Sequence, residues 1–400
     1  MSDNRNQKLF LSGNEAIAYG AKLSRPNVIA AYPITPQTVV VEKLSEMVES
    51  KELNAEFMLV ESEHSALSAM IGASIVGART FTATSSQGLL YMAECLHYAS
   101  GGRYPIVMMN ANRSIALPWS IYGDQRDSLS LLDSGWIQVY AESAQESLDL
   151  VIQAYKIAED LNVLTPFMIN LDGFVLTHTY ESVLIPSQED VDEFLPAFHS
   201  PYIMDLDNPK NMGFSSTPAD NMEFKYQQNK AMLKSKEVIQ KTEIEFGKKF
   251  GRYYGGLIDS YCIEDADVVL ITIGSIAGTV RTVVDKLRNT GTKVGLLKIR
   301  YMRPFPAEEI IKVIRNAKSV GVLEKDISFG FEGTVFTNVS SAVAGSGLTP
   351  KLINFIGGLG GRTITPQHIE DIINDLFKAI NNEIHNHVQF VNLGVEVNEQ

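Results

Sequence analysis

Cysteine is scarce in this sequence of 400 residues, in which only Cys95 and Cys262 occur. An iron–sulfur cluster is held by four thiolates, so two cysteines cannot supply the ligands for one. Two cysteines also provide no disulfide framework. We therefore expect both side chains to be small buried apolar groups.

Long apolar runs and excess positive charge are missing too. No stretch of about 18 apolar residues occurs, so no membrane span is expected. The formal net charge is −13, and an acidic surface repels phosphate backbones and anionic lipids. Residues 1–10 are polar and lack the pattern of a signal peptide. We therefore predict a cytoplasmic protein that binds neither nucleic acid nor membrane.

Several common catalytic signatures are also absent. The sequence has no Walker loop, no evident Ser-His-Asp arrangement and no His-Glu-x-x-His motif. The run Gly357–Gly361 is rich in glycine but does not open a helix directly, so it is a poor nucleotide-binding fingerprint.

The sequence does contain an alternation of strand-like and helix-like segments, which predicts a parallel sheet with helices on both faces. Such sheets bind ligands beyond the carboxyl ends of their strands. Polar turns follow four of the expected strands, and we expect them to share that edge of the sheet. The expected strands of the first part are 28–31, 57–60, 80–84, 106–109 and 167–171, and the turns are 32–36, 61–64, 85–88 and 110–113.

The chain divides into four parts in this interpretation. Residues 1–220 form the first α/β domain, and 221–262 form a helical linker whose charged helix runs from about 222 to 250. A second α/β domain covers 263–385, with a final helix that begins at Thr365 and Pro366. Residues 386–400 are expected to be a frayed polar tail.

The turn Tyr32–Pro36 contains two prolines just past an expected strand. The prolines stiffen the turn, so Pro33, Ile34 and Thr35 are held with little freedom and the Thr35 hydroxyl can be aimed. A rigid connection with no functional role is the alternative interpretation.

The turn Glu61-Ser62-Glu63-His64 also follows an expected strand and opens a helix. A carboxylate at a helix N-terminus is stabilised by the helix dipole, so capping is one explanation. The other is that Glu63 binds a ligand nitrogen, as the aminopyrimidine of thiamine diphosphate requires. There a carboxylate favours the imino tautomer that removes the C2 proton.

Three further polar segments are candidates for binding. Ser86 and Gln87 precede a helix, where backbone N–H groups can bind an anion or hold a ring. Arg113 follows a strand, and its guanidinium can bind both oxygens of a substrate carboxylate. The loop 117–128, which contains Arg126, is either a lid or a solvated turn.

A motif expected of a complete thiamine diphosphate enzyme is missing. Such enzymes hold Mg²⁺ and the diphosphate with a Gly-Asp-Gly sequence followed later by Asn. Gly123-Asp124 is followed by Gln125, and Asp172-Gly173 is preceded by Leu171, so neither completes the motif. We expect no metal site in this chain.

Together, segments along nearly the whole chain resemble the alpha subunits of the pyruvate:ferredoxin oxidoreductases, within the 2-oxoacid:ferredoxin oxidoreductase family. So many segments in one order are far more specific than any single motif. They are Gly13–Ala16, Tyr32–Pro36, Glu61–Ala66, Thr82–Gly88, Asn112-Arg113, Gly123-Asp124, Asp127-Ser128, Asp133–Trp136, Asp172–Phe174, Thr177–Thr179, Arg303–Pro306, Ser328–Gly330 and Gly357–Arg362.

The resemblance implies a thiamine diphosphate domain of the pyrimidine-binding type, followed by a transketolase C-terminal-like α/β domain. It implies oxidative decarboxylation of pyruvate with coenzyme A to acetyl-CoA and CO₂, with electrons passing to ferredoxin. In the family a beta subunit binds the diphosphate and Mg²⁺, and partner subunits such as gamma and delta carry the [4Fe-4S] clusters. This division explains both absences in this chain.

The resemblance also implies roles for single residues. Glu63 falls on the glutamate that binds the aminopyrimidine, and Arg113 and Thr35 fall on positions that contact the substrate carboxylate and its neighbour. Arg126 stands where many relatives carry a neutral residue. The alternatives are the same chemistry on 2-oxoisovalerate or oxalate, or a non-catalytic scaffold subunit. The missing diphosphate motif disfavours a solitary decarboxylase.

Overall fold

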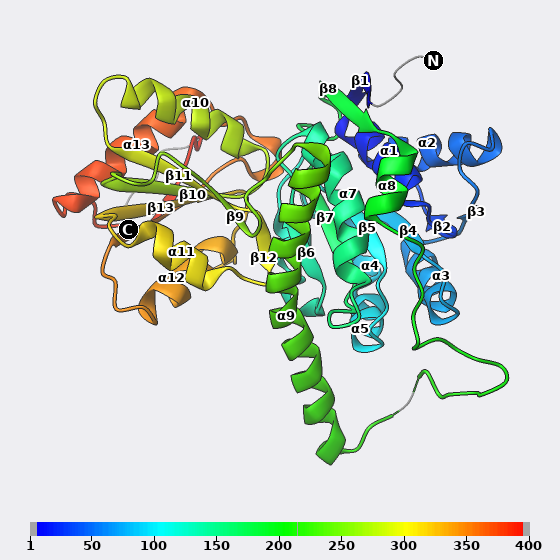
Figure 1. Cartoon of the computed structure of the whole chain (residues 1–400). Coiled ribbons are helices and arrows are strands. Elements are labelled where there is room, and N and C mark those ends of the chain that lie inside the picture. The colour runs from blue at the N-terminus through cyan, green and yellow to red at the C-terminus, as the bar shows by residue number, and fades with distance from the viewer. Residues whose placement is uncertain (1–5, 214, 395–400) are drawn as a thin grey trace.

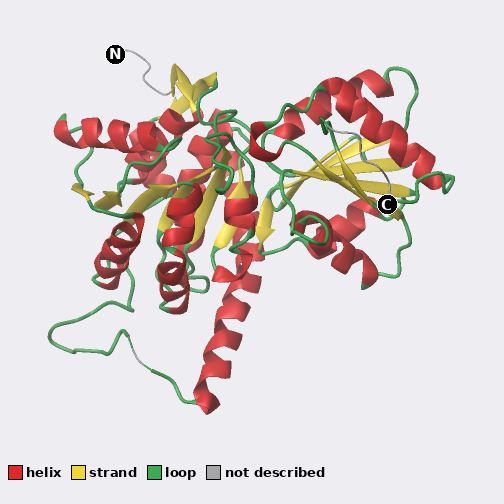
Figure 2. Cartoon of the chain, turned by 180° about the vertical axis from the view of Figure 1, so that it is seen from behind, coloured by secondary structure: helices red, strands yellow, loops and turns green. Residues whose placement is uncertain are grey.

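The computed structural model of the chain describes residues 6–213 and 215–394. Two α/β units lie side by side, and the long helix α9 runs down the boundary between them (Figure 1). Seen from behind, helices cover both faces of each sheet (Figure 2). The predicted α/β class with two parallel sheets is confirmed.

The first sheet has seven strands in the order β12-β6-β7-β5-β4-β2-β3. All neighbours are parallel except β12, which is antiparallel to β6. The strands are β2 (Val28–Ala31), β3 (Glu56–Leu59), β4 (Thr80–Thr84), β5 (Val107–Asn112), β6 (Ile137–Tyr140), β7 (Phe167–Asp172) and β12 (Tyr301–Arg303).

Helices bury their apolar sides on the two faces of this sheet. Side chains of α1, α2 and α7 share one core with the strands, and those of α3, α4 and α5 share the other. A separate antiparallel pair, β1 (Asn6–Ser12) and β8 (Tyr180–Pro186), flanks them. The helices are α1 (Gly13–Ser24), α2 (Thr38–Glu49), α3 (Glu63–Ile75), α4 (Ser86–Tyr91), α5 (Ala93–Gly101), α6 (Arg126–Leu129), η1 (Leu132–Ser134), α7 (Ala144–Ala158) and α8 (Gln188–Phe194).

The second sheet has six strands in the order β15-β14-β13-β10-β11-β9, of which only β9 is antiparallel to its neighbour. Helices α11 and α12 cover one face, and α10 and α13 cover the other. The elements are β9 (Ile258–Tyr261), β10 (Val268–Thr272), α10 (Ile276–Arg288), β11 (Val294–Ile299), α11 (Ala307–Ile314), β13 (Ser319–Glu324), α12 (Thr334–Ala344), β14 (Lys351–Ile356), η2 (Leu359–Gly361), α13 (Pro366–Ile380) and β15 (Val388–Phe390).

Helix α9 (Pro218–Phe250) is the charged helix expected between the domains. Its second half contributes the buried residues Ile239 and Phe246 to the first core, whereas its first half extends beyond the body of the molecule (Figure 1). None of the described helices has the length and apolar character that a membrane span needs.

Four features differ from the expectations. Ser86 and Gln87 were expected to precede a helix but lie inside its first turn, and this helix is split into α4 and α5 at Met92, which has non-helical backbone angles. Strand β9 lies within the expected linker 221–262 but pairs with β11, and β12 leaves the second domain to join the first sheet. Cys95 is buried as expected, but Cys262 is only half-buried.

The first residues of the expected polar tail, 386–400, also form regular structure, because β15 lies within it. Strand β15 pairs in parallel with β14, and the Val391 N–H donates to the carbonyl of Ile356 at 2.8 Å. Edge pairing satisfies backbone groups that a frayed tail would leave in water. Residues 395–400 of the tail lie outside the described residues.

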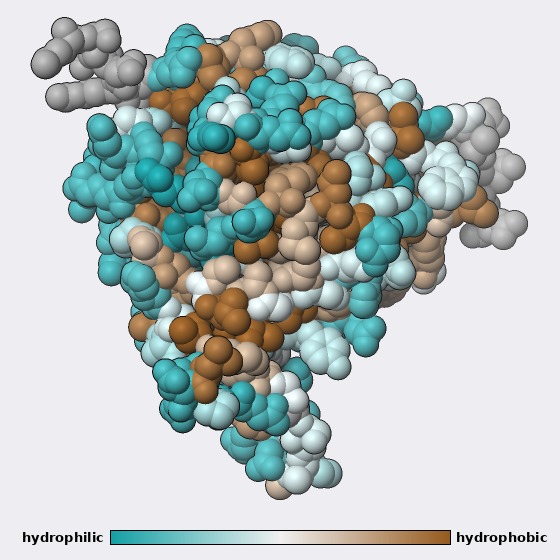
Figure 3. Space-filling view, turned by 90° about the vertical axis from the view of Figure 1, so that its right-hand side faces the viewer, coloured by the Kyte–Doolittle hydropathy of each residue, from teal (hydrophilic) through white to brown (hydrophobic). Residues whose placement is uncertain are grey.

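Strand β3 forms an exposed edge of the first sheet. Met58 and Leu59 are both exposed on this strand, as is Val76 at the end of α3. Hydrophobic surface gathers on this side of the molecule (Figure 3).

A buried ionic cluster joins the two units. Glu146, in the first turn of α7, accepts hydrogen bonds from Lys298 Nζ and Arg300 Nε, each at 2.8 Å. Burial opposes ionisation of Glu146, but Lys298 and Arg300 outweigh it and lower the pKa of this carboxyl to about 2. All three side chains are buried, so removing the anion takes from each cation its shortest ion pair and leaves Lys298 with Glu142 at 3.1 Å and Arg300 with Glu243 at 3.6 Å.

We predict that Glu146→Gln lowers the free energy of unfolding by roughly 3–5 kcal/mol at pH 7, measured by urea denaturation of the full chain. Because the folded pKa lies below the ordinary 4.5, this contribution is present above pH 4.5 and fades as the pH falls toward 2. Asp375→Asn, which breaks an exposed pair with Lys378, should cost less than about 1 kcal/mol. Equal losses of unfolding free energy in the two variants would contradict the stabilising role of the buried Glu146 cluster.

Candidate functional site

The four polar segments lie along the carboxyl edge of the first sheet, as expected from its parallel strands. Two of them are not turns, because 86–88 open α4 and 110–112 continue β5. Glu63 is the first residue of α3, directly after β3. The Ser62 side chain caps this helix by accepting from the Ser65 N–H at 3.2 Å. Ser62 therefore provides the N-cap, and Glu63 is the acidic residue in the first turn of α3, where the helix dipole stabilises a carboxylate.

The Glu63 carboxylate is buried but unpaired. Glu63 is 7% exposed, and no described residue donates a hydrogen bond to its side chain. Gly88 of α4 lies against it, because a Cβ on Gly88 would be 2.4 Å from Glu63 Oε1 and 2.8 Å from Thr84 Oγ1. Glycine at position 88 therefore leaves the carboxylate its space. Neither carboxylate oxygen is completely enclosed, so the group stays open to a donor supplied by a ligand.

Arg113 connects three of the predicted residues. Its Nη1 donates to the carbonyl of Thr35 at 2.7 Å, and its Nη2 donates to Gln87 Oε1 at 2.9 Å. Ser86 Oγ donates to the same Gln87 oxygen at 2.6 Å. Burial lowers the pKa of Arg113, and the charges of Asp127 and Glu63 counteract this. Arg113 Nε and Gln87 Nε2 are buried without a protein partner, so both donors can serve a ligand.

The turn Tyr32–Pro36 is held in place by side chains beneath it. Gln37 Nε2 donates to the carbonyl of Tyr32 at 2.9 Å, and Asn14 Nδ2 donates to that of Pro36 at 2.7 Å. The backbone carbonyl of Thr35 accepts the hydrogen bond from Arg113, whereas the sequence led us to expect a role for the Thr35 hydroxyl. Pro33 is exposed and Ile34 is half-buried in the same turn. Both side chains are apolar, so any contribution to a binding site would be by packing.

The segments on both sides of Arg113 differ from the prediction. Strand β5 continues to Asn112, so the expected turn at 110–113 is mostly strand, paired with β7. In the loop 117–128, Leu117 and Trp119 are exposed, but residues 124, 125, 127 and 128 are buried. The interpretation of this whole loop as a solvated turn is therefore wrong. Its buried half packs at the junction of the two units.

Arg126 is turned toward the second unit. Its guanidinium lies 5.5 Å from the ring centre of Phe329, and Nη2 donates to the carbonyl of Ile115 at 3.1 Å. Next to it, the Gly360 N–H donates to Asp124 Oδ2 at 3.2 Å. These contacts hold the segment 115–126 against the loops at the carboxyl edge of the second sheet.

Sequence reasoning missed Asp127 as a functional candidate. It is fully buried and accepts hydrogen bonds from the backbone of both Ser86 and Arg113. Burial raises the pKa of Asp127 to about 6; Asp124 adds to the rise, and the donors of Asn112, Arg113 and Ser128 oppose it. A polar residue in a loop gives no sign of burial in sequence, so only the tertiary contacts reveal it.

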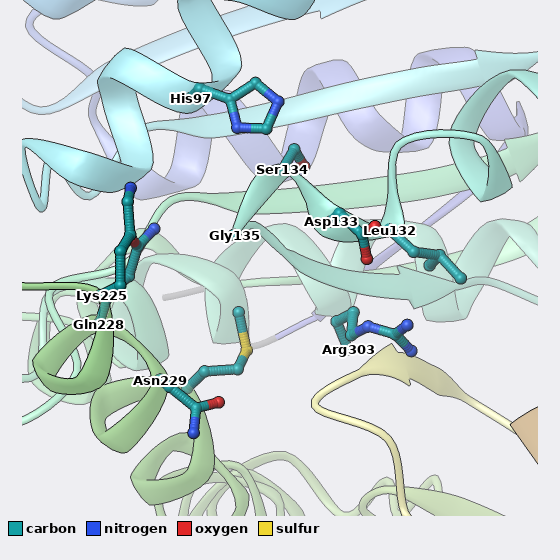
Figure 4. A pocket seen from close by; sticks show the side chains of 10 residues that line it. His97, Leu132, Asp133, Ser134, Gly135, Lys225, Gln228, Asn229 and Arg303 are labelled. Carbon is teal, nitrogen blue, oxygen red and sulfur yellow. The ribbon is translucent and has the colours of Figure 1, made fainter. Parts of the chain in front are cut away.

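A cavity of about 360 Å³ lies elsewhere (Figure 4). It opens between α5, α9 and the segment before β6, and its lining includes His97, Asp133, Lys225 and Arg303. None of the predicted site residues lines it. Across 6–213 and 215–394, no group of His, Cys, Asp or Glu side chains is arranged to hold a metal ion.

Two family sequence models match the chain. Residues 19–243 match the pyruvate flavodoxin/ferredoxin oxidoreductase family, thiamine diphosphate-binding region. Residues 266–369 match core domain II of pyruvate:ferredoxin oxidoreductase.

Curated relatives match over most of the chain. Pyruvate synthase subunit PorA of Methanothermobacter thermautotrophicus is 51% identical, over 91% of this chain and 94% of the relative. Ketoisovalerate oxidoreductase subunit VorA of Pyrococcus horikoshii is 48% identical, over 93% and 94%. Both comparisons extend across the two α/β units.

Solved structures share the fold. A 2-oxoglutarate:ferredoxin oxidoreductase from Magnetococcus marinus superposes with a TM-score of 0.72 at 21% identity, covering 93% of this chain and 65% of that one. A split-gene transketolase superposes at 0.55 with 12% identity, covering 94% and 99%. With two family models and relatives near half identity over its length, the chain belongs to the pyruvate flavodoxin/ferredoxin oxidoreductase family.

Proposed function

We propose that this chain is the alpha subunit of a pyruvate:ferredoxin oxidoreductase and supplies the aminopyrimidine half of its thiamine diphosphate site. The observation that carries the proposal is the carboxylate of the largely buried Glu63, which accepts no hydrogen bond within the described chain, faces Gly88 and stays open to a ligand. A protonated ring nitrogen of an aminopyrimidine provides the missing donor, and the shared proton lies between it and Glu63. When bound, the cofactor supplies the carbon nucleophile that attacks the 2-oxoacid.

The other site residues fit the same proposal. Arg113 holds one pocket wall together through Thr35 and Gln87, and its free Nε can bind a substrate carboxylate. Ser86 and Gln87, with Pro33 and Ile34 of the facing turn, would border the cofactor ring. Glu63 would hold the proton exchanged with the aminopyrimidine.

Pyruvate is the proposed substrate because PorA of Methanothermobacter thermautotrophicus, at 51% identity, is named a pyruvate synthase subunit. Thr35 is small and neutral, which suits a monocarboxylate better than a dianion such as oxalate. The second candidate is 2-oxoisovalerate, because a ketoisovalerate oxidoreductase subunit is 48% identical.

The remaining parts of the reaction belong to partner subunits in this proposal. A beta subunit would bind the diphosphate and Mg²⁺, and gamma and delta subunits or their equivalents would carry the [4Fe-4S] clusters. Coenzyme A and ferredoxin would then act through the assembled complex. The apolar edge at β3 and the exposed Leu117 and Trp119 leave this chain ample surface for such contacts.

We expect Glu63→Gln to reduce kcat for pyruvate oxidation by about 10²–10⁴-fold in the assembled complex, because an amide does not exchange the proton. Glu61→Gln is the matched control, since Glu61 is two residues away and exposed. The measurement is ferredoxin reduction by each purified complex. Wild-type turnover of the Glu63 variant would remove the proposed role.

A second prediction concerns the space around that carboxylate. Gly88→Ala should reduce activity about 10²-fold, because the new methyl group must displace the Glu63 carboxylate. Gly101→Ala, at the end of α5, meets nothing within 4 Å and should keep wild-type activity. Both complexes are assayed for turnover and for cofactor content. Full activity of Gly88→Ala would show that Glu63 does not need its present position.

A further inference from the structure

Asp127 lies behind the proposed pocket and touches both of its walls. Its Oδ2 accepts from the backbone N–H of Ser86 at 3.1 Å and from that of Arg113 at 3.2 Å. These residues follow β4 and β5, which are neighbouring strands. One carboxylate oxygen therefore sets the distance between the turn that carries Gln87 and the residue that carries the guanidinium.

The rest of the carboxylate is fully engaged. Asn110 Nδ2 is a third donor to Oδ2 at 3.3 Å, and Oδ1 accepts from Asn112 Nδ2 at 2.7 Å and from the Ser128 N–H at 2.8 Å. Ser128 Oγ in turn lies 2.8 Å from the Tyr140 hydroxyl. All five partners of the carboxylate are N–H donors, so only a group with two acceptor oxygens satisfies them.

Ser86 has an unusual backbone that this contact helps to hold. Its φ is 50°, in the left-handed region that a serine rarely adopts. The N–H bond to Asp127 and the Oγ bonds to Gln87 Oε1 and the carbonyl of Ser114 keep it there. Strained backbone of this kind persists only where surrounding contacts over-determine it.

We infer that Asp127 is a positioning residue for the 2-oxoacid: it does not touch the substrate, but it holds Arg113 and the Ser86-Gln87 turn in carboxylate-binding geometry. The inference rests on the proposed function. Asp127 and Glu63 have different roles in this inference, and no hydrogen bond joins them. Losing Asp127 should therefore impair use of the 2-oxoacid through Arg113 more than binding of the cofactor, whose diphosphate is assigned to the beta subunit in the proposed function.

Asp127→Asn is a nearly isosteric test. In either orientation the amide turns its NH₂ toward at least two N–H donors, which cannot be satisfied. We expect kcat/KM for the 2-oxoacid to fall about 10²-fold, chiefly through KM, as the guanidinium is misplaced. Thiamine diphosphate content and subunit assembly should remain near wild-type.

The matched control is Asp124→Asn, which alters a buried aspartate on the same segment. The Asp124 carboxylate accepts hydrogen bonds from the backbone N–H groups of Gly360 and Arg126 and faces the second unit. Its kcat/KM should stay close to wild-type. A similar loss in both variants would mean that any buried aspartate here is needed for stability alone, and would overturn the inference.

The deciding experiment is a double-mutant cycle with Arg113→Ala, measured as kcat/KM in the assembled complex. If Asp127 acts through Arg113, the double variant is no worse than Arg113→Ala alone. Losses that multiply would overturn the inference. Should Asp127→Asn fail to assemble, Asn112→Ala removes one donor to Oδ1 and should give a smaller loss that is likewise absent in the Arg113→Ala background.

The outcomes for the two proposals are distinguishable. An active Glu63→Gln complex would remove the proposed function, whatever Asp127 does. An inactive Glu63→Gln complex combined with multiplying losses for Asp127 and Arg113 would remove only the positioning role.

Discussion

The proposed site depends on Glu63, a largely buried residue whose carboxylate accepts no hydrogen bond within the described chain and stays open to a donor from outside it. The surrounding residues leave this carboxylate free. Ser62 provides the N-cap of α3, and the missing side chain of Gly88 leaves space beside the Glu63 carboxylate. The carboxylate therefore lacks a hydrogen-bond donor until a ligand supplies one, which agrees with the proposed half-site.

The second constraint is the polar network around Arg113. A guanidinium bonded to Thr35 and Gln87, and an aspartate bonded to the backbone beneath it, form one continuous set of contacts. The neighbouring segment 115–126 is held by the second α/β unit through Gly360 and Phe329. The second unit therefore packs against the segment that follows Arg113, although it contributes no predicted site residue.

The sequence predicts the regular parts well because their signals are local. Fully buried strands such as β4 and β10 are runs of β-branched and apolar residues, and α13 begins with a capping threonine and a proline. Strand β12 has three residues and joins the other domain's sheet, so no local pattern reveals it. Burial of Asp127 depends on contacts with Ser86 and Arg113. The roles of Glu63 and Arg113 came from family resemblance, whereas their hydrogen-bond environment required the structure.

The most direct test of the half-site is calorimetric titration of the purified chain with thiamine diphosphate and Mg²⁺, alone and after addition of the diphosphate-binding beta subunit. The diphosphate carries most of the cofactor's charge. This chain has a net charge of −13, and its described residues include no group of side chains arranged to hold a metal ion. We predict weak or undetectable binding to the free chain and tight, Mg²⁺-dependent binding once the beta subunit is present. Tight Mg²⁺-dependent binding by the chain alone would contradict the shared site and indicate a complete cofactor site in this subunit.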